Sequence, residues 1–164
     1  MKIILLFFIL IAVDLTGQEK ITVSTNPSET FIETYETFLS DQLVLKAAYR
    51  LGPASTKILK DGLTTALKWI ALNEDHQKTF EKEICRFKAM EKELYKFHGY
   101  VDQFSVEMTL LFKGYPGGVF ELEIKTYDGF SVFILFEEKE QVEKFKGMLN
   151  GKSANKEIDD IFKK

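Results

Sequence analysis

Three polar residues, His76, Glu83 and Arg86, have side chains and spacing that suit acid–base chemistry. If the segment is helical, at 100° per residue, His76 and Glu83 share one face with Phe80, Phe87, Met90, Leu94 and Phe97. A carboxylate on an apolar face is costly unless it is paired, and a perturbed pKa there suits a general acid or base. These three residues are therefore the candidates for a polar site.

Arg86 follows Glu83 by three residues, the spacing of neighbours on a helix surface. The favoured interpretation is a buried structural ion pair that fixes how the helix docks. The alternative is a general acid or base in a cleft. His76 lies two turns from Glu83, roughly 10 Å along the helix axis, so a direct His–Glu dyad is not expected.

Metal and cofactor chemistry have no support in the sequence. The chain has two histidines and one cysteine, and His76, His98 and Cys85 lack the spacing of zinc ligands. Cys85 is expected on the opposite helix face among lysines, where its pKa could be lowered. No histidine shares that face, so a cysteine hydrolase is not expected. A single cysteine also excludes an internal disulfide.

The helix that must position these residues is predicted over 74–98, with Gly99 as its stop. Two further helices are predicted before it. Asn26 and Pro27 form a helix start signal, so the first is expected over about 26–49, although the alternation over 43–49 also fits a strand. The second is expected over 54–72, where Gly62 suggests the close approach of a neighbouring helix.

Alternating apolar residues predict three antiparallel strands over 104–113, 120–125 and 130–136, joined by glycine-rich turns. Pairing Phe112 with Phe120 is favoured over pairing Phe112 with Leu122, because it sets Glu107 opposite Lys125. A three-residue turn before the third strand is favoured because it places one set of apolar residues on a common core face. That set is Phe120, Leu122, Ile124, Phe130, Val132, Ile134 and Phe136.

A helix over 138–150 follows the strands, and Ile158, Ile161 and Phe162 suggest a final short helix. The predicted fold class is therefore α+β. N-terminal helices pack on a three-stranded antiparallel meander, which is followed by one or two C-terminal helices.

The N-terminus is typical of a secretory signal peptide. Lys2 precedes an apolar run over 3–13, which is too short to cross a bilayer, and Gly17 offers a small residue for cleavage. The leader resembles those of small exported bacterial proteins. We expect a signal peptide over 1–17 and a single domain over 18–164; an uncleaved anchor is the alternative. The net charge of −3 gives no electrostatic case for nucleic-acid binding.

The favoured function is a non-enzymatic binding module of the cell envelope, periplasmic or extracellular, with a protein or an envelope component as its partner. A small hydrolase using a buried Glu83 is one alternative. A carrier of apolar ligands is another, because the phenylalanines of the mature chain, all of the fifteen except Phe7 and Phe8, could line a lipid-sized cavity. No cofactor, nucleic acid or transmembrane span in the mature chain is expected.

Overall fold

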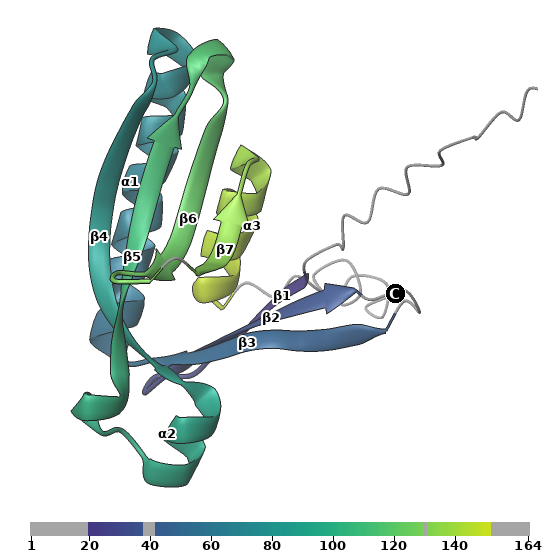
Figure 1. The fold of residues 1–164 in the computed structure, drawn as a ribbon, viewed down its shortest axis with the longest axis vertical. Helices are drawn as coiled ribbons and strands as arrows, with labels where there is room; N and C mark the ends of the chain where they lie inside the picture. Colours follow the sequence, from purple (N-terminus) through teal and green to yellow (C-terminus); the bar gives the residue numbers. More distant parts are fainter. Residues whose placement is uncertain (1–19, 38–41, 130, 152–164) are drawn as a thin grey trace, which may run out of the picture.

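A single antiparallel sheet dominates the computed structural model, which describes residues 20–37, 42–129 and 131–151. In that part of the chain, seven strands lie side by side in sequence order (Figure 1). Helix α1 is inserted between β3 and β4 in the sequence, although the two strands are neighbours in the sheet. The strands are β1 (Lys20–Thr25), β2 (Thr30–Thr37), β3 (Leu43–Leu51), β4 (Phe80–Glu91), β5 (Ser105–Gly114), β6 (Phe120–Thr126) and β7 (Val132–Phe136). The helices are α1 (Pro53–His76), α2 (Lys92–His98) and α3 (Lys139–Leu149), with short 3-10 turns η1 (Asp102–Phe104) and η2 (Pro116–Gly118).

The helix expected over 26–49 is therefore wrong, and the meander has more strands than predicted. Residues 26–29 form a turn, 30–37 form β2 and 43–49 belong to β3, and Asn26 caps the turn in place of a helix. Its Oδ1 accepts hydrogen bonds from the backbone N–H groups of Ser28 and Glu29, at 2.9 and 3.0 Å. The Asn26 N–H donates to the Glu29 carbonyl, which closes the loop between β1 and β2.

The predicted helix over 74–98 is also wrong, since its middle part forms strand β4. The pairing of β4 with β5 shifts register between Glu83 and Cys85, where Ile84 is an extra residue. The strand has a period of two on each side of this β-bulge. The bulge puts Phe80, Ile84 and Phe87 at spacings of four and three residues, which are also the spacings of one helix face. Helix occurs only at the two ends of this range, in the last residues of α1 and in the short α2, and Gly99 ends α2 as expected.

Other predicted elements are confirmed. The helix over 54–72 is α1, the three strands of the predicted meander are β5 to β7, and the helix over 138–150 is α3. A capping box between Glu138 and Gln141 begins α3, and its apolar side is buried through Val142, Phe145 and Leu149.

The expected register of β5 against β6 is wrong by two residues: Phe112 pairs with Leu122. A five-residue loop sets this register, in which the Tyr115 N–H donates to the Val119 carbonyl at 2.9 Å. The expected face of the last strand is confirmed for Ile134 and Phe136, which lie beside Ile124 and Leu122 and are buried. Phe130 lies outside the described residues, as do the predicted leader over 1–17 and the short helix near Ile158.

The sheet consists of two parts that run in different directions. Strands β3 and β4 pair only at Tyr49–Glu91 and Arg50–Met90, and the arm made of β1, β2 and β3 runs across the direction of β4 to β7 (Figure 1). α1 covers one face of β4 to β6, and α3 packs between α1, β7 and β1.

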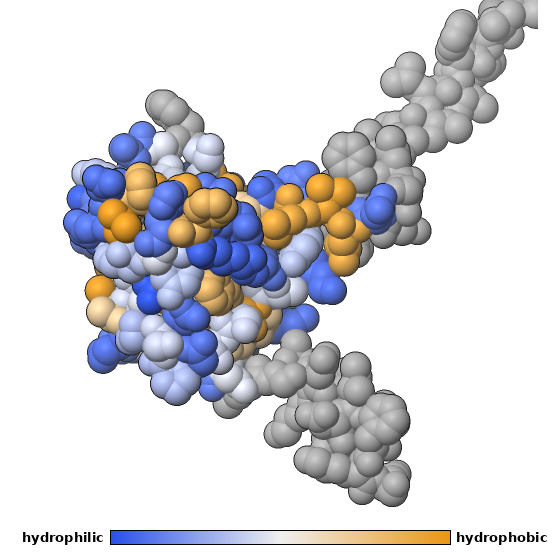
Figure 2. Space-filling model, turned by 90° about the horizontal axis from the view of Figure 1, so that it is seen from below, coloured by the Kyte–Doolittle hydropathy of each residue, from blue (hydrophilic) through white to orange (hydrophobic). Residues whose placement is uncertain are grey.

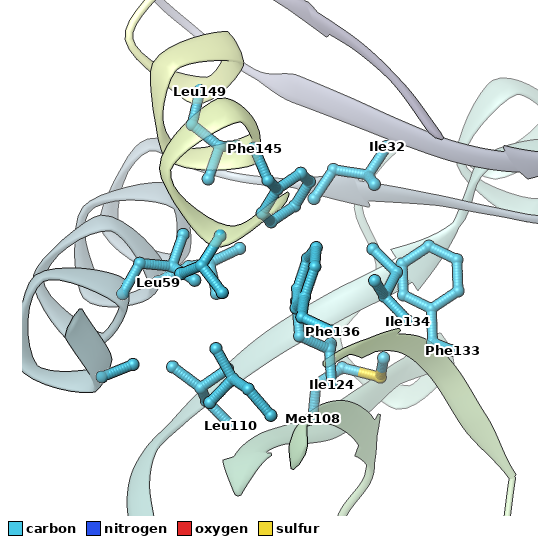
Figure 3. Close-up of a cluster of buried hydrophobic side chains, with 14 of the residues drawn as sticks. Ile32, Leu59, Met108, Leu110, Ile124, Phe133, Ile134, Phe136, Phe145 and Leu149 are labelled. Carbon is cyan, nitrogen blue, oxygen red and sulfur yellow. The ribbon is translucent and has the colours of Figure 1, made fainter. Parts of the chain in front are cut away.

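The core fills the space between the two helices and the two parts of the sheet. In Figure 3, Phe145 and Leu149 of α3 meet Ile32 of β2 and Phe136 of β7. The rings of Phe136 and Phe145 lie 5.2 Å apart. This burial is the main stabilising contribution in a chain without a disulfide.

Candidate functional site

The structure separates the three predicted polar-site residues. His76 is the last residue of α1 and is exposed, while Glu83 and Arg86 lie on β4. Within the described residues, no hydrogen bond or ion pair joins His76 to either of the other two.

Glu83 and Arg86 do meet, but on an exposed strand and not on a buried helix. Arg86 Nε and Nη2 donate to the two Glu83 carboxylate oxygens at 2.8 and 2.9 Å, and this contact raises the pKa of Arg86. Residues three apart on a regular strand point to opposite faces; the bulge at Ile84 brings these two onto one face. Their side chains are 41% and 39% exposed, so the expectation of a buried pair is wrong.

Cys85 points into the protein and not toward the surface lysines. Its Sγ lies under α1, 3.8 Å from the Ile58 carbonyl oxygen, and desolvation raises its pKa to about 11. The thiolate is therefore disfavoured, and the expectation of a lowered pKa is wrong. Gly62 does mark a close approach, but to Cys85 of β4 and Leu110 of β5 and not to a helix.

Glu123 is the one buried carboxylate among the described residues, and no sequence pattern singled it out. Its alternation in β6 placed it correctly on the face away from α1, but Lys113 and Lys125 cover it there. Lys113 Nζ lies 2.5 Å from Glu123 Oε1, and Lys125 Nζ lies 3.7 Å from Oε2. Glu123 and the two lysines therefore form a structural ion-pair network.

A cleft of about 570 Å3 lies between the first turn of α1 and strand β4. Three cationic residues, Arg50, Arg86 and Lys88, line it with Glu107, Phe87 and Tyr100. Lys88 is paired with Asp102 at 2.7 Å, Arg86 is paired with Glu83, and Arg50 Nε lies 3.6 Å from Glu29.

These pairings decide what the cleft can bind. Each cation already has a carboxylate partner, so the cleft offers no excess positive charge to an anion or to nucleic acid. Its wall is charged, and Phe87 is the one phenylalanine in it, so it does not resemble a lipid cavity. In the described part of the chain, no group of three or more histidine, cysteine or carboxylate side chains could hold a metal ion.

The outer edge of β3 is the remaining candidate. Its residues 43–45 and 47–48 pair with β2 on one side, with Lys46 as a bulge residue between them, and none of these residues pairs with a described strand on the other side. Leu43, Val44 and Leu45 are 45%, 49% and 48% exposed, although large aliphatic side chains are usually buried. Figure 2 shows an apolar group at the end of the arm made of β1 to β3.

In comparisons with known proteins, no family model, no curated protein and no solved structure matches the chain. Of the helices in the described residues, none has the length and apolar character needed to span a membrane.

Proposed function

We propose that this chain is an exported, non-enzymatic binding module of the cell envelope that binds an extended polypeptide segment along the free edge of β3. The observation that carries the proposal is the edge itself. An unpaired edge presents a row of N–H and C=O groups to another strand, and flanking side chains add specificity. Natural proteins usually protect such edges with charge, bulges or proline. Here Lys46 lies in a bulge, but Leu43, Val44 and Leu45 before it leave that part of the edge apolar and accessible.

Export is the part of the proposal that rests on sequence alone. The apolar run over 3–13 behind Lys2 supports a signal peptide. A binding module in the envelope meets other folded and unfolded chains there, which suits recognition through backbone groups.

A hydrolase function and a second apolar binding surface, at α2, both have less support. A hydrolase using Glu83 would need a free carboxylate in a sheltered site, but both of its oxygens accept hydrogen bonds from Arg86 on an exposed strand. Phe97 of α2 is 87% exposed and is another apolar contact point, but its helix neighbours Glu93, Lys96 and His98 are polar, so it forms no extended patch.

Capture from an envelope extract tests the proposal. Tagged protein, recovered from a host that exports the full-length chain, is immobilised, and bound polypeptides and lipids are identified by mass spectrometry. Leu45→Lys places a charge on the edge; Leu72→Lys is the matched control, since Leu72 is 47% exposed on α1. We expect wild type and the Leu72 variant to retain a polypeptide, this chain included, that the Leu45 variant loses. Equal capture by all three proteins, or binding of lipid alone, would contradict the proposal.

A further inference from the structure

We infer that the strand bound at the β3 edge is the β3 strand of a second copy of this chain, in a symmetric antiparallel pair. The inference rests on the proposed function, because it identifies the occupant of the same edge. It begins from the side chains on both faces of the strand. Leu43 and Leu45 lie on one face, and Val44 on the other, since successive residues of a strand alternate.

The occupant must therefore be apolar on both faces over at least three residues, and another β3 meets this requirement. An antiparallel pair centred on Val44 sets Val44 against Val44 and each Leu43 against the Leu45 of the other copy. Every exposed aliphatic side chain then gains an apolar cross-strand neighbour. The same patch is used on both copies, so the contact closes with a two-fold axis and leaves no end for further growth.

Charge favours the same register. Lys46 follows the apolar residues directly, and a pair centred on Lys46 would place two ammonium groups opposite each other. The register centred on Val44 avoids this contact, and Lys46, which lies in a β-bulge, ends the regular part of the edge. Lys46 Nζ also lies 3.3 Å from Glu36 Oε1, so its charge is partly balanced within its own copy.

The shape of the molecule leaves this edge accessible. The pairing of β3 with β4 ends at Tyr49 and Arg50, and the arm then extends away from β4 to β7 (Figure 1). The contact is short, because the regular pairing centred on Val44 involves Leu43, Val44 and Leu45 of each copy. Interfaces of this size are weak, with dissociation constants of about micromolar or higher, so covalent capture is the suitable detection method.

Disulfide cross-linking between introduced cysteines tests the register directly. In a Cys85→Ala background, Val44→Cys should form a disulfide-linked dimer under mild oxidation, because directly opposed Cβ atoms lie within about 4.5–5.5 Å. Leu43→Cys and Leu45→Cys should dimerise poorly alone but should link to each other when mixed. Leu72→Cys, on the surface of α1, is the control for random collision. Unfolding curves like that of wild type confirm that each variant is folded.

The outcomes separate this inference from the proposed function. Loss of the monomer band for Val44→Cys, and for the Leu43→Cys and Leu45→Cys mixture, supports self-pairing in this register. Dimer yields no higher than for Leu72→Cys, or equal yields for all three edge cysteines alone, overturn it. If they do so while Leu45→Lys still abolishes capture of a different polypeptide, the proposed function stands and only the second copy is excluded. If capture also fails to depend on Leu45, both are excluded.

Discussion

The sulfur of Cys85 occupies the space beside Gly62: a Cβ atom placed on this glycine would lie 2.5 Å from Sγ. The helical backbone at this point of α1 does not require a glycine, since alanine is more favourable than glycine inside a helix by about 1 kcal/mol. The glycine is required because α1 packs closely on β4.

Gly62→Ala should therefore lower the free energy of unfolding by about 1–2 kcal/mol, because crowding outweighs the gain in helix propensity. In a Cys85→Ala background the same change should cost much less, since the sulfur is gone. Urea unfolding of the four proteins measures this coupling. Equal losses in both backgrounds would show that Cys85 is not the obstacle.

Burial of Cys85 should be visible in its reactivity. With its pKa raised to about 11, the thiol of folded protein holds less thiolate at pH 8.5 than the thiol of unfolded protein. Because the residue is only partly buried, we expect alkylation by iodoacetamide to be slower by at least about tenfold in the folded state. Comparison of rates with and without urea, against free cysteine, checks this. Similar rates in both states would contradict the burial of Sγ.

The raised pKa of Cys85 also fixes the sign of a pH effect. The unfolded chain loses this proton near the ordinary value of 9.0, and the folded chain near 11, so the thiol stabilises the fold fully below pH 9. Stability should fall between these two values, and it should fall less in Cys85→Ala.

Glu33 should contribute a pH-dependent part of stability at acidic pH. A hydrogen bond from Lys92 lowers its pKa below 4.5, and both side chains are 21% exposed. The contribution is present above pH 4.5 and is lost as the pH falls toward the folded-state pKa. Glu33→Gln should cost about 1 kcal/mol at pH 7 and almost nothing well below pH 4. Glu36→Gln, on the same strand, is the control. A cost that does not change with pH would contradict the pairing.

The exposed Glu83–Arg86 pair should matter little for stability. Arg86→Met and Glu83→Gln should each leave the free energy of unfolding nearly unchanged, because solvent screens exposed pairs. Lys57→Met breaks the exposed pair with Asp61, and its effect on the free energy of unfolding is the reference for an exposed ion pair. A loss of about 3 kcal/mol, typical of a stranded buried charge, would instead favour the buried pair expected from the sequence.

How far the sequence predicts this fold depends on local irregularities. Helix α1, the strands β5 to β7 and α3 follow from regular periodicity and clear turn or capping residues. Strand β4 does not, because the bulge at Ile84 shifts its period by one residue, and Glu, Lys and Met in it favour helix. The pairing of β2 with β3 has a similar bulge at Lys46 of β3, and β2 buries Thr30 and Thr34 where a sequence pattern would look for aliphatic residues.

The candidate site was less predictable than the fold. Leu43 and Leu45 fitted a strand from their alternation, but their exposure depends on where β3 separates from β4. The two strands pair only at Tyr49–Glu91 and Arg50–Met90, and no pattern within residues 43–48 predicts that the pairing stops there. The Glu83–Arg86 contact was found from helical spacing, although a β-bulge produces it.

Hydrogen exchange of the β3 amides tests the central claim most directly. An edge strand bonds alternate N–H groups to its one neighbour and leaves the others free. In dilute protein, the outward amides over 43–48 should exchange rapidly, and in concentrated protein they should become protected while amides elsewhere keep their rates. The Leu45→Lys variant should show fast exchange at both concentrations. Outward amides that exchange at the same rate in dilute and concentrated wild-type protein would contradict pairing at this edge.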